Sequence, residues 1–188
     1  MNARQFFINF LKDLRIGAVS RTFPRTAEMI CNTVMEDDPN IIVEYGPGDG
    51  TITRRILKQL PASGRLIAIE TNEAFIHELN KIKDQRLTIV EGSAVDIASI
   101  LSRLSIQSVN CIFSGIPFSL LPMNVRLSII KPSFEALANN GTMVVYQYTP
   151  IVRRLMRQQF GNSSLQVSFG NIPLYFIMKS RRKHARTA

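Results

Sequence analysis

Hydrophobic and polar positions follow two rhythms along the chain. Short apolar runs bounded by turn residues are typical of buried strands, and they lie at 41–45, 65–70, 87–91, 110–114 and 142–148. Between them, apolar residues recur at helical spacing, which predicts helices over 51–60, 73–83, 97–104, 124–138 and 151–160. Short strands that alternate with helices predict βαβ units and a parallel sheet covered on both faces.

The rhythm changes after residue 160. Two apolar stretches, 165–169 and 173–179, flank the pair Gly170-Asn171, and such a pair is typical of a tight connection between strands. Strands joined so closely pair antiparallel. The chain is therefore expected to end in an antiparallel hairpin.

The N-terminal stretch predicts an amphipathic helix. Phe6, Phe7 and Phe10 recur on one helical face, with basic residues around them. The stretch is too short and too polar to span a bilayer, and it lacks the clean apolar region and cleavage site of a signal peptide. Such a helix packs either on its own core or in a membrane interface, and the pattern alone fits both.

Length and composition indicate one soluble globular domain. The chain has 188 residues, 45% hydrophobic and 20% charged, which is enough to bury a core. Its two cysteines lie in apolar contexts, and with two histidines they form no set with metal-ligand spacing. We therefore expect neither a metal site nor a disulfide framework.

The net charge of +9 is concentrated at the two ends of the chain. Residues 1–30 carry five basic and two acidic residues, and residues 151–188 carry eight basic and none acidic, whereas 31–150 carries ten basic and twelve acidic. A basic surface suits an anionic membrane or a nucleic acid, and charge alone does not choose between them.

A glycine-rich turn follows the first predicted strand. Glu44 closes that strand, and three alternating glycines come next: Gly46, Gly48 and Gly50. Such a turn before a helix brings the backbone close to a ligand. The spacing departs from the dinucleotide fingerprint, because that fingerprint would need glycine at Thr51. Glu70 closes the second strand, 24 positions after Gly46, where a carboxylate can accept both hydroxyls of a ribose.

The pattern E-x-G-x-G-x-G from Glu44 to Gly50, with Glu70 after the next strand, resembles the class I S-adenosylmethionine-dependent methyltransferases over nearly the whole chain. The resemblance implies a Rossmann-like α/β fold with a mostly parallel seven-stranded sheet and an antiparallel last strand. It implies S-adenosyl-L-methionine as cofactor, with the glycines beside its methionine part and Glu70 on its ribose. The remaining residues expected to bind the cofactor are Glu44, Thr71, Ser93, Ala94, Asp96 and Ser114, of which Ser93, Ala94 and Asp96 would lie beside the adenine.

The segment after the fourth strand is expected to hold the acceptor. Methyltransferases that act on amino nitrogens have Asn or Asp, two prolines and an aromatic residue there, whereas this chain has Ser114, then Gly115-Ile116-Pro117-Phe118. The serine hydroxyl, or main-chain carbonyls around Gly115, would therefore have to hold the acceptor amine. The residues expected to carry the reaction are Ser114, Gly115, Tyr146 and Tyr148, and Tyr175 is a further candidate to contact the headgroup.

This loop, the basic N-terminus, Gly17-Ala18-Val19 and Tyr146-Gln147-Tyr148 resemble the bacterial phospholipid N-methyltransferases. Those relatives of the ribosomal RNA adenine dimethyltransferases methylate the amine of phosphatidylethanolamine. The resemblance implies an enzyme on the inner face of the cytoplasmic membrane, whose partners are an anionic membrane surface and an aminophospholipid and not a nucleic acid. Arg21 departs from the family, which often has proline there.

The resemblance also divides the chain. Residues 1–30 are expected to form N-terminal helices that pack on the domain and face the membrane, 31–180 the methyltransferase domain, and 181–188 a basic tail. Three alternatives stay open. An RNA adenine N6-methyltransferase suits the basic ends, but Ser114 and the missing extra helical domain speak against it. A small-molecule N-methyltransferase and an inactive, membrane-associated module that binds the cofactor are the others.

Overall fold

Seven strands form one sheet in the described part of the chain, in the order β3-β2-β1-β4-β5-β7-β6. The computed structural model describes residues 24–35, 39–169 and 174–183. The strands are β1 (Ile41–Tyr45), β2 (Arg65–Glu70), β3 (Leu87–Glu91), β4 (Val109–Ser114), β5 (Leu137–Gln147), β6 (Ser164–Ser168) and β7 (Tyr175–Arg181). The first five pair parallel, and β7 pairs antiparallel with both β5 and β6.

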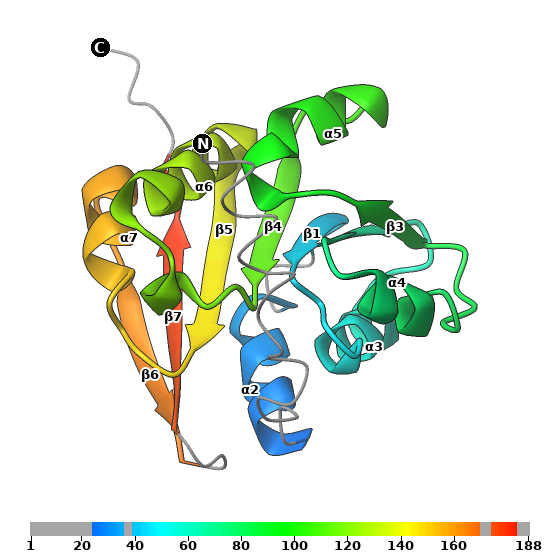
Figure 1. Ribbon diagram of the computed structural model, residues 1–188, viewed down its shortest axis with the longest axis horizontal. Coiled ribbons are helices and arrows are strands. Elements are labelled where there is room, and N and C mark those ends of the chain that lie inside the picture. Colours follow the sequence, from blue (N-terminus) through cyan, green and yellow to red (C-terminus); the bar gives the residue numbers. More distant parts are fainter. Residues whose placement is uncertain (1–23, 36–38, 170–173, 184–188) are drawn as a thin grey trace.

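Helices cover both faces of this sheet (Figure 1). They are α2 (Pro24–Met35), α3 (Thr51–Gln59), α4 (Glu73–Leu79), α5 (Ile97–Arg103), α6 (Met123–Ala136) and α7 (Arg153–Phe160), with short 3-10 turns η2 (Ala94–Asp96) and η3 (Phe118–Leu120). One apolar core packs α5, α6 and α7 on the sheet, and a second packs α2 and α3 on its other face. The predicted α/β fold with a C-terminal antiparallel hairpin is confirmed.

The sheet brings distant parts of the sequence to one edge. The parallel strands β1 to β5 all end there, and we call it the carboxyl edge. Because β7 runs antiparallel to β5, with Gln147 opposite Phe176, the start of β7 lies at the same edge. The strand order reverses at β1, which lies between β2 and β4. Open α/β sheets bind their ligands in the crevice outside such a switch point.

Most predicted boundaries agree with the structure within a few residues, and the largest difference is in β5. This strand begins at Leu137 instead of residue 142, because the stretch predicted as a turn lies inside it. The pairing with β4 shifts register between Val109 and Cys111, and Asn140 adopts a left-handed conformation with φ of 63°. The predicted turn is therefore an irregularity within the strand.

Helix α2 joins the N-terminal part of the chain to the core. It runs across residues 30 and 31, where the sequence analysis divided the N-terminal helices from the methyltransferase domain. Its residues Ala27, Ile30 and Cys31 are all buried, so α2 belongs to the domain as a whole.

Several predictions concern segments outside the described residues: the amphipathic helix with Phe6 and Phe10, the position of Arg21, the Gly170-Asn171 turn, and residues 184–188 of the tail. None of the helices described in the structure has the length and apolar character needed to cross a membrane.

Candidate functional site

The glycine loop and the second acidic position are hydrogen-bonded to each other. The amide of Gly48 donates to Oε2 of Glu70 at 3.2 Å. The other carboxylate oxygen of Glu70 accepts from the amides of Thr71 at 2.7 Å and Asn72 at 3.0 Å. Burial raises the pKa of Glu70, and these backbone donors oppose the rise. Two motifs that lie 22 residues apart thus form one rigid unit at the ends of β1 and β2.

Two glycines of the loop have different roles. Gly48 has φ of +58°, and a Cβ added there would meet nothing within 4 Å, so the loop faces open space at this point. Gly50 has φ of +77°, and its Cβ would lie 3.1 Å from side-chain carbons of both Leu79 and Ile82. Gly48 therefore leaves room for a ligand, while Gly50 lets the start of α3 pack closely on the segment at the end of α4.

Glu44 is a fully buried acid behind the glycine loop. Its Oε2 accepts from the hydroxyl of Thr53 at 2.7 Å, while its Oε1 is buried and has no hydrogen-bond partner among the described residues. Burial raises its pKa to about 8; the Thr53 hydrogen bond opposes this rise, and the charges of Glu70 and Asp49 add to it. The sequence analysis did not single out Thr53, although a threonine on the apolar face of the predicted helix was a signal for such a partner.

The residues predicted to lie beside the adenine follow β3 at the same edge. Ser93 is fully buried, and its hydroxyl accepts from the amide of Val95 at 3.4 Å, which starts the turn η2. The amide of Gly92 donates to the main-chain oxygen of Glu70 at 2.9 Å and holds this segment next to the end of β2. Ala94 is buried and Asp96 is partly exposed.

Residues 114–118, at and after the end of β4, are the segment expected to hold the acceptor, and we call them the acceptor loop. This loop is held tightly against the glycine loop. A Cβ on Gly115 would lie 2.9 Å from the hydroxyl oxygen of Tyr146 and 3.0 Å from the main-chain oxygen of Gly46. A side chain therefore does not fit at this position without movement. Ser114, which the sequence analysis put in the polar acceptor position, is fully buried, and its hydroxyl accepts from the amide of Ile116 at 3.4 Å. Gly115, and not Ser114, is thus the residue that contacts both the glycine loop and the tyrosine.

Three tyrosines meet where β5 ends and β7 begins. The hydroxyl of Tyr175 donates to that of Tyr148 at 3.1 Å, with their ring centroids 4.6 Å apart. The rings of Tyr146 and Tyr175 lie 6.5 Å apart. Burial raises the pKa of Tyr146 well above its ordinary value, so its phenol stays protonated at neutral pH. The structure therefore groups these three residues at the carboxyl edge.

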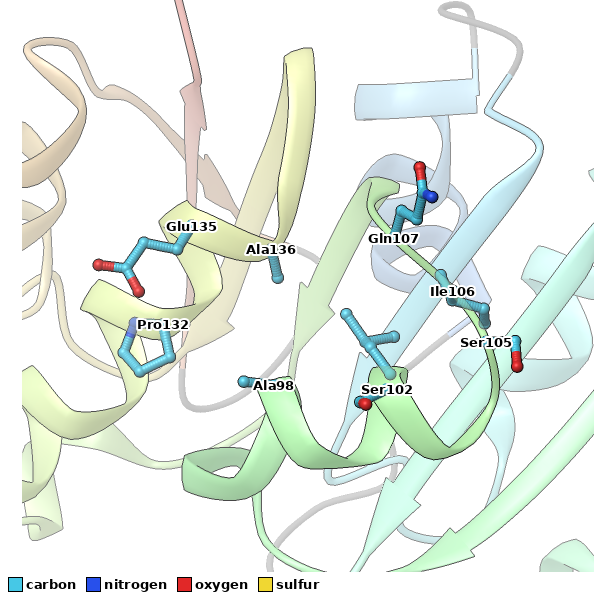
Figure 2. A pocket seen from close by; sticks show the side chains of 9 residues that line it. Ala98, Ser102, Ser105, Ile106, Gln107, Pro132, Glu135 and Ala136 are labelled. Atoms are coloured by element: carbon cyan, nitrogen blue, oxygen red, sulfur yellow. The ribbon is translucent and has the colours of Figure 1, made fainter.

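A hollow lies at the opposite edge of the sheet. It has a volume of about 530 Å³ and is lined by α5, the segment before β4 and the last turns of α6. Figure 2 shows Ser102 and Gln107 on one side of it, and Pro132 and Glu135 on the other. These segments precede the amino ends of β4 and β5, so this hollow is separate from the glycine loop. In the part of the chain that the structure describes, no group of three or more His, Cys, Asp and Glu residues has the arrangement to hold a metal ion.

Comparisons with known proteins lead to methyltransferases. No model of a known protein family matches the chain. The chain is 23% identical over 177 residues to an ornithine lipid N-methyltransferase from Singulisphaera acidiphila, across 90% of the chain and 92% of that relative. It is 27% identical over 121 residues to a probable ribosomal RNA small subunit methyltransferase A from Methanospirillum hungatei, across 61% of the chain and 42% of the relative.

Solved structures show the same architecture. The crystal structure of an O-methyltransferase from Streptomyces achromogenes in complex with S-adenosylmethionine aligns with a TM-score of 0.71 at 15% identity, across 97% of this chain and 88% of that one. At this low identity the likeness shows the fold alone. Together with the strand order and the glycine loop closed on Glu70, it establishes that this chain has the class I S-adenosylmethionine-dependent methyltransferase fold that its sequence predicted.

Proposed function

We propose that this protein transfers a methyl group from S-adenosyl-L-methionine to the amine of a membrane aminolipid, with phosphatidylethanolamine as the expected substrate. The observation that carries the proposal is the similarity to an ornithine lipid N-methyltransferase across nine-tenths of both chains. Phosphatidylethanolamine and an ornithine lipid share a primary amine on a lipid headgroup, which is the chemistry that the acceptor loop has to recognise.

The glycine loop and the two acidic residues at the carboxyl edge fit this cofactor. Open space faces the backbone at Gly48, the carboxylate of Glu70 is fixed by backbone amides for contact with ribose hydroxyls, and a buried oxygen of Glu44 lacks a partner within the described residues. A cation favours the ionised form of a neighbouring acid, so Glu44 suits a positively charged ligand. When bound, the cofactor supplies an activated methyl group on a positively charged sulfur, together with its own leaving group.

The residues of the acceptor loop have to hold a neutral amine in line with that methyl group. An alkylammonium loses its proton only near pH ~10, as a lysine amine does. Ile116 and Phe118 are buried apolar neighbours of the loop, and an apolar site lowers the pKa of an ammonium. The main chain at Gly115 and the neutral hydroxyl of Tyr146 offer acceptors for the amine hydrogens. Their contribution is alignment, which is the larger part of what such a transfer requires.

The second candidate is methylation of an RNA adenine. The partial similarity to a ribosomal RNA methyltransferase favours it, but that similarity spans less than half of the relative. The acceptor loop also has no Asn or Asp between residues 114 and 118 that would grip an adenine amine by its side chain. We therefore favour a lipid amine, with the protein at the inner face of the cytoplasmic membrane.

The test uses the wild-type protein, labelled S-adenosylmethionine and mixed phosphatidylethanolamine/phosphatidylglycerol vesicles, and it measures label in the extracted lipid. Label in methylated phosphatidylethanolamine supports the proposal, and the product also gives the number of methyl groups added. Parallel reactions contain vesicles with ornithine lipid, ribosomal RNA, or small amines. Label confined to RNA would establish the second candidate. Cofactor binding without label in any acceptor would indicate an inactive module.

A further inference from the structure

Large apolar side chains are exposed at one edge of the described structure. Among the described residues, those with more than a third of their surface exposed are Leu120, Met123, Leu127, Ile151, Phe169 and Leu174. We call this set the apolar rim. Phe169 is 80% exposed and Met123 is 54% exposed, so these side chains contribute little to the core.

All members of the apolar rim belong to segments that begin or end at the carboxyl edge. Leu120 lies in η3 and Met123 and Leu127 in the first turns of α6, after the end of β4. Ile151 follows β5, Phe169 follows β6, and Leu174 precedes β7, whose first residues lie at the carboxyl edge (Figure 1). This is the edge that also holds the acceptor loop.

The first described helix starts at the same place. The hydroxyls of Thr26 and Ser168 are hydrogen-bonded at 2.8 Å, so the first turn of α2 touches the end of β6. The exposed Arg25 and Phe169 are the chain neighbours of this pair. The start of α2 therefore lies beside Phe169 of the apolar rim, and residues 1–23, in which the sequence predicts an amphipathic helix, precede it in the chain.

Basic side chains lie on the helix that follows Ile151 of the apolar rim. Helix α7 begins two residues after Ile151 and carries Arg153, Arg154 and Arg157, which line a hollow of about 430 Å³. Arg153 donates to the main-chain oxygen of Ser163 at 3.1 Å, whereas Arg154 and Arg157 are exposed. Residues 151 to 183 include no acidic residue. Basic residues close to an anionic bilayer are attracted to its surface.

We propose that the carboxyl edge is the membrane-facing surface of this protein, with the apolar rim inserted at the headgroup boundary of an anionic bilayer and Arg154 and Arg157 on lipid phosphates. Apolar side chains bordered by basic ones match both layers of such an interface. RNA would use the arginines but would leave the aliphatic rim exposed to water. The inference rests on the proposed function, because it lets a lipid amine reach the acceptor loop without leaving the membrane.

The test is vesicle co-sedimentation of the full chain with the paired change Met123→Glu and Phe169→Glu. Burial of the two side chains is lost and two negative charges are added, so binding to phosphatidylglycerol/phosphatidylethanolamine vesicles should fall by at least about tenfold. The matched control is Ser102→Glu with Gln107→Glu, which adds the same charge at exposed positions of the opposite edge (Figure 2), and its binding should stay unchanged. Arg154→Gln with Arg157→Gln should weaken binding to anionic vesicles but not to phosphatidylcholine vesicles.

Methyl transfer to a short-chain phosphatidylethanolamine below its micelle concentration separates this proposal from the proposed function. The rim variant should retain this activity and its calorimetric affinity for the cofactor. If the rim variant binds vesicles as well as the wild type, the proposed membrane surface is wrong. An equal loss of vesicle binding in the control variant would also overturn it. The surface would likewise be wrong if the rim variant lost as much methyl transfer to the soluble lipid as to vesicles. Rim-dependent vesicle binding without methyl transfer to any lipid would support the surface and reject the proposed reaction.

Discussion

The two halves of the sheet carry side chains of different chemistry at the carboxyl edge. The half formed by β1, β2 and β3 presents two buried acidic side chains, Glu44 and Glu70, and fixes the latter with backbone amides. The half formed by β5, β7 and β6 presents neutral tyrosines, and its sequence from 151 to 183 includes no acidic residue. One half is thus suited to a cation and to hydroxyl groups, and the other to an uncharged amine.

This difference has a chemical reason. A carboxylate beside the acceptor would stabilise its ammonium form and keep the nitrogen lone pair protonated, whereas a carboxylate beside a positively charged cofactor strengthens binding. The two demands conflict unless they are separated in space. The end of β4 lies between the halves, and Gly115 is the point where they touch, through Gly46 on one side and Tyr146 on the other.

The largest effect is expected from removing the acid that unites the two motifs. Glu70→Ala leaves the amides of Gly48, Thr71 and Asn72 without their acceptor and removes the proposed contact with the ribose. Affinity for S-adenosylmethionine, measured by calorimetry, should fall about 100-fold. Glu70→Gln keeps one oxygen acceptor and should lose less. Unchanged affinity in the alanine variant, with an unchanged circular dichroism spectrum, would remove Glu70 from the site.

The first half could be predicted from sequence more fully than the second. The glycine loop, its strand and its helix are contiguous in the chain, and Glu70 ends the very next strand, so local patterns are enough to bring them together. The tyrosine cluster depends on the pairing of β5 with β7, which joins Tyr148 to a residue 27 positions away. The apolar rim collects residues from three separate connections. No local pattern distinguishes these exposed side chains from core residues.

The packing of the acceptor loop is hidden from the sequence for a similar reason. Ser114 is the last residue of β4, and alternation along that strand decides whether its side chain faces the site or the interior. The sequence analysis named it because it stands where related methyltransferases have Asn or Asp, with the main chain around Gly115 as the alternative. Steric exclusion at Gly115 arises from Gly46 and Tyr146, and neither approach is visible before the strands are paired.

The charge of the cofactor half can be tested through pH. The pKa of Glu44 is raised from its ordinary 4.5 to about 8, so the folded protein keeps a proton that the unfolded chain releases. The resulting stability is complete below the unfolded pKa and is lost as pH rises through 8. Between about pH 6 and about pH 8 the free energy of unfolding of the wild type should fall by about 2 kcal/mol from this group.

Glu44→Gln should remove that part of the pH dependence, because the amide keeps an acceptor for Thr53 and does not ionise. Urea unfolding of both proteins across this pH range, without cofactor, gives the comparison. If wild type and variant lose stability in parallel, the buried acid is not the proton-binding group.

A methyl group at the junction of the halves should lower turnover and leave cofactor binding nearly intact. Gly115→Ala places a Cβ against the hydroxyl of Tyr146 and the main-chain oxygen of Gly46. The displaced loop should reduce kcat roughly tenfold through misalignment of the acceptor. Tyr146→Phe in the same chain removes the nearest of the three close atoms, the hydroxyl oxygen, and leaves the ring carbon at 3.1 Å and the Gly46 oxygen, so the double variant should recover part of the loss. If the fold loss of kcat in the double variant equals the product of the losses in the two single variants, contact with the Tyr146 hydroxyl is not what displaces the loop.

The smallest effect is expected within the tyrosine cluster of the acceptor half. Tyr148→Phe removes the acceptor of the Tyr175 hydroxyl but keeps the ring at 4.6 Å from its neighbour. Because one neutral hydrogen bond is lost, the KM for phosphatidylethanolamine should rise about threefold, while the affinity for S-adenosylmethionine stays unchanged. Tyr148→Leu also removes the ring and should raise the KM further. A change in cofactor affinity with either substitution would contradict the division of labour between the halves, because this hydroxyl pair belongs to the side that we assign to the acceptor alone.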